Sequence, residues 1–293
     1  MVGLLNVTKR FGSLVAVRGV TLTMEQPGVY GLLGTNGAGK TTTIRMLCGI
    51  IQPNEGERVF SREYVNRIGY MPEELAVYRD SSLEEHLRLL GKLRNIPAKT
   101  LFLNVVELVK ALDLSSVVRR PVGYLSKGTA RKVQYVCTVA HEPQLLVLDE
   151  PFSGLDPISA HIMEQDLRRR CAAGCTILLS THQIEQAERF CNHVFMLHRG
   201  QKVIDSDLVN LLDDPLIQRY EVVTAKALEG TPIDFSLEGM ERGRYRYSIS
   251  VPRESAKQQE FFSVLGGCDV ISMRTVRVGL NEVFLNTVED VKP

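Results

Sequence analysis

The 293-residue sequence lacks any apolar run that approaches the roughly 18 residues of a membrane span. It also lacks an excess of charge of one sign, since 35 Lys and Arg face 34 Asp and Glu and leave a formal net charge of +1. A near-neutral balance gives no reason to expect a nucleic acid as the partner. The first residues are too short a stretch, and too uncharged, to predict a secretion signal.

Cysteine is scarce and scattered. Six Cys residues are present, and they do not make the two pairs that a zinc site needs. We therefore expect a reduced, cytosolic chain. The length allows one large domain, or one domain with a smaller one attached.

A glycine-rich stretch fits the phosphate-loop pattern of two Gly bracketing four residues and followed by Lys and Thr. It reads Gly34-Thr35-Asn36-Gly37-Ala38-Gly39-Lys40-Thr41. Residues 28–33 predict a short apolar strand before it, and residues 42–47 predict a helix after it. The alternative is a Gly-rich turn without function, but strand, loop and helix in this order are the context that the motif requires.

The chemistry of such a loop follows from its residues. Glycine allows the backbone to curl so that successive N–H groups point at a phosphate chain, and the helix N-terminus adds its dipole. Lys40 is placed to reach the β- and γ-phosphates of a nucleotide, and the Thr41 hydroxyl to ligate Mg²⁺.

A second motif lies at residues 144–150, where four apolar residues predict a buried strand of a parallel sheet. Two acids, Asp149 and Glu150, end this strand. Burying adjacent acids is unfavourable unless something compensates for their charge, and in a phosphate-loop protein that is Mg²⁺. We expect Asp149 to hold the metal and Glu150 to orient and deprotonate a water. A solvent-exposed acid pair is the alternative.

The remaining pattern predicts alternating strands and helices. We expect strands at 4–8, 20–24, 65–71 and 176–180, and a hairpin over 194–204. Helices are expected from Ser81–Glu85 to Asn95, and at 98–112, 130–137, 158–172 and 184–190. After a boundary at 211–215, the pattern predicts strands at 219–223, 244–251 and 270–276 and helices at 255–265 and 281–288.

Three further residues or stretches are weaker signals by themselves. Phe11 beside Gly12 is most often a loop anchor. Residues Leu125 to Thr129 start a helix with Ser and Gly, and on spacing alone an ordinary N-cap is favoured over an anion site. His182 follows a buried strand, at the edge where parallel sheets bind ligands.

The order of the motifs along this chain resembles that in the ATP-binding subunit of ABC transporters. These motifs are residues 34–41, 125–129, 145–150 and 153–156, followed by His182. The resemblance covers residues 1–210. It implies an α/β fold, a P-loop NTPase ABC ATPase domain with a mixed sheet core and a helical subdomain at about 74–140. Residues 211–293 are expected to form a small α+β C-terminal domain, a dimerisation or regulatory module whose last stretch resembles the drug, lipid and antibiotic exporter branch.

The resemblance also implies roles for single residues. Two domains stack head to tail around two ATP molecules, each held on Gly34 to Thr42 of one subunit and capped by Ser126 and Gly128 of the other. This favours the anion site at Ser126 over the ordinary cap. The remaining roles are these: Phe11 stacks on adenine, Asp156 links the two sites, His182 contacts the γ-phosphate, and Glu150, His182 and Lys40 are catalytic.

Departures from the family pattern concern three places. Glu73 stands where the family commonly has Gln, and we expect it still to contact Mg²⁺ and water beside Thr41 and Asp149. Lys127 and Thr129 replace Gly and Gln near Ser126. Residues 53–69 are short, which predicts a trimmed hairpin.

The expected partners are a second ATP-binding subunit, of the same or another chain, and an integral membrane permease, with no nucleic acid. This places the chain on the cytoplasmic face of the membrane. A soluble ABC-type ATPase of translation or DNA repair is the rival, but this chain has one cassette and no heptad run. A purely regulatory module would lack a catalytic group, and Lys40, Asp149, Glu150 and His182 are all present.

Overall fold

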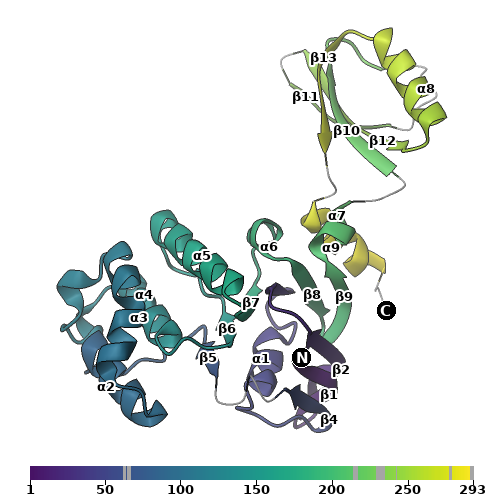
Figure 1. Ribbon diagram of the computed structural model, residues 1–293. Helices are drawn as coiled ribbons and strands as arrows, with labels where there is room; N and C mark the ends of the chain where they lie inside the picture. The colour runs from purple at the N-terminus through teal and green to yellow at the C-terminus, as the bar shows by residue number, and fades with distance from the viewer. Residues whose placement is uncertain are drawn as a thin grey trace. The chain divides into compact units, whose positions relative to one another are not determined.

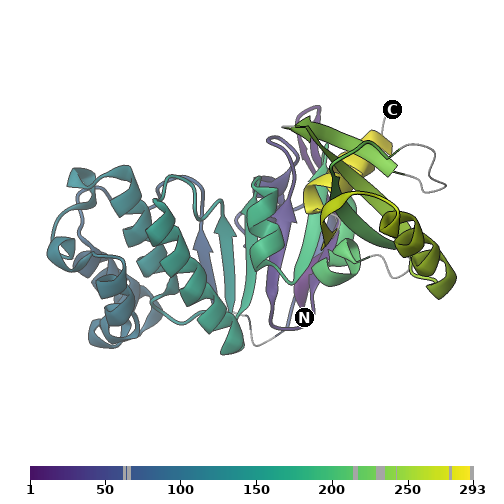
Figure 2. The same cartoon turned by 90° about the horizontal axis from the view of Figure 1, so that it is seen from above.

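The computed structural model describes residues 1–61, 64, 67–213, 217–228, 235–241, 243–276 and 279–290. The chain divides into two compact units, residues 1–206 and 207–293. Both are drawn in Figure 1 and, turned by 90°, in Figure 2. Residues 65–66 of the expected strand and 214–215 of the expected boundary lie outside the described residues.

The first unit opens with a three-stranded antiparallel sheet in the order β2-β1-β4. Its strands are β1 (Val2–Phe11), β2 (Leu14–Met24) and β4 (Glu55–Phe60). The expected strands at 4–8 and 20–24 lie inside β1 and β2, which run longer because backbone pairing continues to Phe11 and Leu14. Where we expected a trimmed hairpin, in the described residues of 53–69, β4 pairs with β1, and the next strand, β5, begins at Ile68 and belongs to another sheet.

A six-stranded sheet in the order β5-β6-β7-β3-β8-β9 forms the centre of this unit. The strands are β3 (Val29–Leu33), β5 (Ile68–Met71), β6 (Leu145–Asp149), β7 (Thr176–Thr181), β8 (His193–His198) and β9 (Gln201–Asp207). The pairs β5–β6, β6–β7, β7–β3 and β3–β8 are parallel. Every residue of β6 and β7 is buried, as their apolar runs predict. The carboxyl ends of β6, β7 and β3 therefore lie next to one another at one edge.

Six helices accompany these sheets: α1 (Lys40–Leu47), α2 (Leu83–Arg94), α3 (Ala98–Ala111), α4 (Lys127–Val139), α5 (Pro157–Ala172) and α6 (Ile184–Phe190). Ser82 caps α2 in a capping box with Glu85, as the spacing predicts. Helices α2, α3 and α4 pack together at one end of the unit, next to β5 (Figures 1 and 2). Short 3₁₀ turns at Ser115–Val117 and Val122–Tyr124 lead into α4.

The second unit is an α+β module with its own core. It contains α7 (Leu208–Leu212), β10 (Ile217–Thr224), β11 (Phe235–Glu241), β12 (Arg244–Pro252), α8 (Ser255–Gly266), β13 (Val270–Val276) and α9 (Leu280–Asp290). The sheet is antiparallel in the order β11-β12-β10-β13, and Phe261 and Leu265 of α8 pack on one face of it. Sequence reasoning missed β11, whose residues are almost all exposed and whose short alternation from Phe235 to Glu238 breaks at Gly239, where the pairing with β12 shifts register.

Candidate active site

The glycine-rich loop lies between β3 and α1, as predicted. Gly34, Gly37 and Gly39 have φ angles of 148°, 79° and 101°. A Cβ at Gly34 would lie 2.4 Å from the carbonyl oxygen of Leu197, and one at Gly39 would lie 2.7 Å from that of Ala16. Only glycine fits this close backbone packing, which shapes the loop at the N-terminus of α1.

Lys40, the first helical residue, folds back over the loop. Its Nζ donates hydrogen bonds to the carbonyl oxygens of Gly34 (2.7 Å) and Thr35 (3.2 Å). Burial lowers the pKa of the ammonium group, and the charges of Glu150, Asp149 and Glu73 oppose that shift. The loop therefore holds a positive charge where a phosphate chain lies in proteins with this motif.

Asp149 is joined to two neighbouring elements at the end of β6. The Thr41 hydroxyl donates to its Oδ2 (2.9 Å), and the Ser180 hydroxyl of β7 donates to its Oδ1. Asp149 and Ser180 are also paired in the parallel register of β6 and β7. The prediction that Thr41 and Asp149 share a site is therefore matched by a direct contact.

The donor set at this point suits a hard cation. Among the described residues, no group of three or more His, Cys, Asp or Glu side chains could hold a metal alone. One hydroxyl and one carboxylate fit Mg²⁺, because this ion usually keeps several water ligands and takes further ligands from substrate phosphates. Thr41 and Asp149 are the residues that would hold it.

Glu150 has a backbone conformation unusual for its type, with φ at 49°. Its N–H donates to the carbonyl oxygen (3.2 Å) and the hydroxyl (3.1 Å) of Ser180. His182 Nδ1 lies 2.8 Å from Glu150 Oε1. A left-handed non-glycine residue costs about 1–2 kcal/mol, and such strain concentrates at functional sites.

A cleft of about 820 Å³ brings most of the predicted residues together. It is lined by Phe11, Asn36, Gly37, Ala38, Gly39, Lys40, Thr41, Thr42, Glu73, Asp149, Glu150 and His182, and also by Leu14, Val15, Ala16, Arg199 and Gly200. Phe11 is half exposed at the end of β1, with Lys9 Nζ 5.4 Å from its ring centre. An aromatic ring, a phosphate loop and a metal-ligand pair in one cleft are the parts of a nucleotide site.

Comparison with known proteins decides the family. A family profile described as "ABC transporter" matches residues 17–153. The uncharacterized ABC transporter ATP-binding protein YhaQ of Bacillus subtilis (strain 168) is 35% identical over 208 residues, which are 69% of this chain and 70% of that protein. The chain belongs to the ABC transporter ATP-binding family. It binds and hydrolyses ATP as the ATP-binding subunit of such a transporter.

Two further matches extend the comparison. A Nod factor export ATP-binding protein I of Burkholderia lata is 36% identical over 208 residues, 68% of each chain. A solved structure titled "Structure of ATP binding subunit of ABC transporter" is 30% identical, with a TM-score of 0.67, and the match covers 72% of this chain and 91% of that chain. The fold of the ABC ATPase is thus the predicted one.

Five residues predicted to serve the ABC ATPase do not line this cleft. Gly34 and Thr35 belong to the phosphate loop itself, where their carbonyl oxygens accept hydrogen bonds from Lys40. The other three lie elsewhere. Ser126 is the N-cap of α4, where its Oγ accepts from Thr129 N (3.2 Å). Asp156 caps α5 and accepts from the N–H (2.9 Å) and the hydroxyl (2.6 Å) of Ser159, bonds that lower the pKa of its carboxyl. Gly128 lies in the first turn of α4, where a Cβ would approach the Gly154 carbonyl oxygen at 3.2 Å. Within one chain, these three residues form helix starts outside the cleft.

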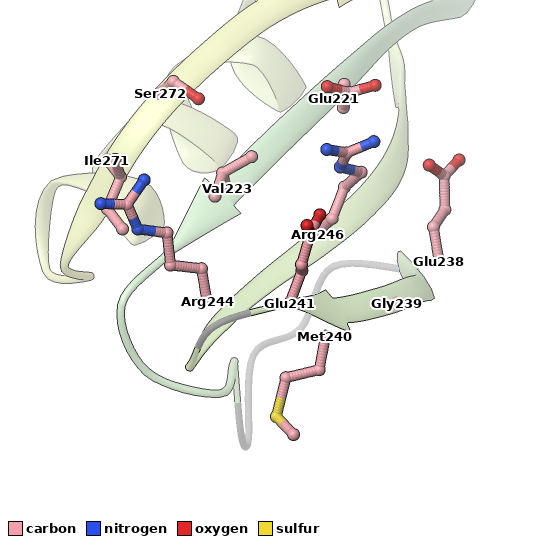
Figure 3. Close-up of a pocket in the computed structure, with 10 residues that line it drawn as sticks. All are labelled: Glu221, Val223, Glu238, Gly239, Met240, Glu241, Arg244, Arg246, Ile271 and Ser272. Carbon is pink, nitrogen blue, oxygen red and sulfur yellow. The ribbon is translucent and has the colours of Figure 1, made fainter.

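A second cleft of the ABC ATPase lies on the sheet of the C-terminal unit (Figure 3). Arg244 and Arg246 stand two residues apart on β12, and the carboxylates of Glu221, Glu238 and Glu241 lie around them. Because the two signs of charge are interspersed, this cleft lacks the positive field of a phosphate site. Of these two clefts, the one at the phosphate loop is therefore the candidate for the nucleotide site.

Sequence reasoning missed Ser180 and Arg131 as site residues. Ser180 is one hydroxyl inside an apolar strand, and the parallel pairing with Asp149 was the signal that could have found it. Arg131 lies on α4 among other charged residues, yet it is only 6% exposed. Nothing in the local pattern distinguishes it from a residue on a solvated helix face.

Proposed function

We propose that this ABC ATPase powers export of a solute through a separate membrane permease, as one of two ATP-binding subunits that close on two ATP molecules. The observation that carries the proposal is the joining of Thr41 to Asp149 and of Glu150 to His182 in one cleft beneath Lys40. Those contacts support a hydrolytic site to which this chain contributes the metal ligands, the base and the histidine. The domain division at about residue 210, the second subunit and the permease are parts of the same proposal.

The chain's own residues divide the chemistry among them. The N–H groups of residues 34–42 and the Lys40 ammonium bind and orient the phosphate chain, and Phe11 packs against adenine. Thr41 and Asp149, with Glu73 nearby, would hold Mg²⁺, which would supply charge neutralisation at the β- and γ-phosphates.

Glu150 and His182 complete the reaction. The Glu150 carboxylate accepts the proton of the attacking water, and His182 holds that carboxylate in position through the bond at Nδ1. Charge that develops on the γ-phosphate is stabilised by Lys40 and His182 of one subunit. Ser126 and Gly128 of the other subunit contribute the N-terminus of α4.

Transport through a separate chain agrees with the helices present. None of the helices in the described part of the chain has the length and apolar character of a membrane span. ABC ATPase subunits work with membrane permeases and usually pair. We place this subunit on the cytoplasmic face of the membrane, with α2, α3 and α4 moving as the subdomain that meets the permease.

Export, rather than import, rests on two supports. Several relatives are called Nod factor export ATP-binding proteins, and one of them is 36% identical over 208 residues. The stretch at 281–288 resembles the last residues of the drug, lipid and antibiotic exporter branch. The nature of the solute would be set by the permease.

Co-purification tests the proposal. A tagged Glu150→Gln chain is isolated from native membranes with ATP and Mg²⁺ present, and its partners are identified by mass spectrometry, with tagged Glu142→Gln as the control. A partner with several apolar spans is the expected result. A soluble partner, or ribosomes, without any membrane protein would leave the ATPase chemistry in place and overturn the transport function.

A further inference from the structure

Arg131 is a buried cation that bonds to the backbone of two separate segments. Its Nη1 donates to the carbonyl oxygens of Pro72 and Glu73, both at 2.7 Å. Its Nη2 donates to those of Asp149 (2.9 Å) and Glu150 (2.8 Å). One guanidinium therefore joins the loop after β5 to the end of β6.

The two segments carry groups of the nucleotide cleft. Glu73, Asp149 and Glu150 all line it. On its other side, the Glu150 peptide is held by its N–H, which donates to Ser180. Arg131 thus fixes the carbonyl of the same residue whose carboxylate meets His182.

Arg131 also belongs to the helix that begins at Ser126. It lies about one turn into α4 (Lys127–Val139), five residues after the N-cap. Gln134, one turn further, supports the same loop through Nε2, which donates to the carbonyl oxygens of Pro72 (3.2 Å) and Glu74 (3.0 Å). The loop after β5 and the start of α4 are therefore parts of one hydrogen-bonded unit.

Only arginine suits this place. Its planar guanidinium offers two nitrogens pointing apart, each with two N–H groups, so that it can serve two segments at once. A lysine ammonium donates from a single point and would reach one segment at a time. Burial lowers the pKa of the guanidinium, and the nearby carboxylates of Glu73, Asp149 and Glu150 oppose that shift.

We propose that Arg131 is a positioning residue that couples the catalytic end of β6 and the Glu73 loop to the helix carrying Ser126 and Gly128. This inference rests on the proposed function in one respect, the role of Ser126 toward a second subunit. Nucleotide bound in a chain's own cleft then sets, through Arg131, the orientation of the N-terminus of α4. That N-terminus is the part of α4 that the chain presents to its partner. The two sites of the pair communicate through one side chain in each subunit.

The test compares Arg131→Lys with Arg170→Lys in the full-length chain with its permease. Arg170 is a matched control, because it is an arginine whose side chain is only 10% exposed, bonds to Asp166 on α5 and does not line the cleft. We expect Arg131→Lys to lower kcat by at least about tenfold while KM for ATP changes less than about threefold, since the phosphate loop is untouched. Arg170→Lys should lower thermal stability without lowering kcat.

Hydrogen exchange provides the readout that a general loss of stability would not give. In Arg131→Lys, peptides covering 70–75 and 149–155 should exchange faster, while the peptide covering 34–42 is unchanged. In a Glu150→Gln background, ATP should protect the amides of residues 124–129 from exchange. Adding Arg131→Lys should remove that protection, whereas adding Arg170→Lys should keep it. Arg131→Gln, which can donate to one segment only, gives the same comparison if the lysine variant does not fold.

Two results would overturn the positioning role. One is a kcat for Arg131→Lys that falls no further than that of Arg170→Lys; the other is equal exchange of the three peptides in both variants. If the Glu150→Gln chain shows no ATP-dependent protection at 124–129, closure of the proposed pair fails instead. The kinetic and exchange differences at 70–75 and 149–155 then decide the role of Arg131 by themselves.

Discussion

His182 Nδ1 lies 2.8 Å from Oε1 of Glu150, and the two side chains differ sharply in exposure. The Glu150 side chain is 10% exposed and that of His182 is 53% exposed. The imidazole therefore meets the carboxylate from the solvent side and fixes one of its oxygens. In the proposed mechanism, the other oxygen, Oε2, is the one left to accept a proton from the attacking water.

The first prediction concerns this carboxylate. Glu150→Gln keeps the shape of the side chain but removes the proton acceptor, so kcat should fall by about 10²-fold or more. ATP binding should stay within about threefold of the parent, because the phosphate loop is intact. Phosphate release and nucleotide titration measure the two effects. Glu142→Gln, an exposed residue before β6, is the control, and hydrolysis at the parent rate in Glu150→Gln would refute the assignment.

A second prediction separates stability from activity. Glu150 and Glu142 both have φ at 49°, a conformation that glycine adopts without strain. The left-handed region costs a glutamate about 1–2 kcal/mol, which a glycine does not lose. Glycine instead loses about 0.5–1 kcal/mol more in chain entropy on folding. The free energy of unfolding of each Gly variant should therefore match or exceed that of the parent. Glu150→Gly should nevertheless lose hydrolysis. Denaturant unfolding tests this, and a Glu150→Gly chain much less stable than Glu142→Gly contradicts it.

Local patterns in the sequence were enough to predict the sheet that bears the site. Buried strands such as β6 and β7 can be recognised in the sequence, because both of their faces are covered and their residues are therefore mostly apolar. The parallel arrangement then places Thr41 beside Asp149. Contacts made through backbone atoms were not predictable. The four carbonyl oxygens that Arg131 binds belong to segments 59 and 18 residues away. Because every residue has a backbone carbonyl, such contacts cannot be recognised from residue types. Strand β11 was missed for a different reason, since an exposed strand need not alternate.

A third prediction concerns Lys40. Lys40→Ala removes the charge held over the loop, and ATP affinity should fall by at least about tenfold, or 1.4 kcal/mol. The loop also loses two hydrogen bonds to the carbonyl oxygens of Gly34 and Thr35, so we expect about 1–2 kcal/mol less stability. Calorimetric titration with ATP measures the affinity. Lys110→Ala, an exposed lysine on α3 that pairs with Glu107, is the control, and unchanged affinity in Lys40→Ala rules out the loop as the phosphate site.

A fourth prediction addresses Asp149. An amide at this position accepts at one atom only, so Asp149→Asn cannot satisfy both the Thr41 and the Ser180 hydroxyls as the carboxylate does. The Mg²⁺ concentration for half-maximal hydrolysis should rise by about tenfold or more. Titration of activity with Mg²⁺ provides the measurement. An Mg²⁺ dependence equal to the parent's would remove Asp149 from the metal site.

A fifth prediction concerns pH. Burial, with help from the positive charges of Arg94 and Arg170, lowers the pKa of His141 to about 4, although the Ile68 carbonyl opposes the shift. The unfolded chain takes up this proton near pH 6.5 and the folded chain does not. Stability is therefore complete above pH 6.5 and declines as pH falls toward 4, by about 2–3 kcal/mol in total.

The comparison of His141→Gln with the parent isolates this group. The difference in free energy of unfolding between the two should change with pH only between 6.5 and 4. His161→Gln, at an exposed position on α5, is the matched histidine control. A pH profile of His141→Gln that is parallel to the parent's throughout this range would contradict the argument.

The contact between Thr41 and Asp149 joins residues 108 positions apart, and that of Glu150 with His182 spans a further 32. When only the first 140 residues have been synthesised, the phosphate loop is complete but Asp149 and Glu150 are still missing. Hydrolysis becomes possible only after β6 and β7 have been synthesised and have docked beside β3. The order of these strands along the chain therefore predicts that an incomplete chain gains its phosphate loop before it can hydrolyse ATP.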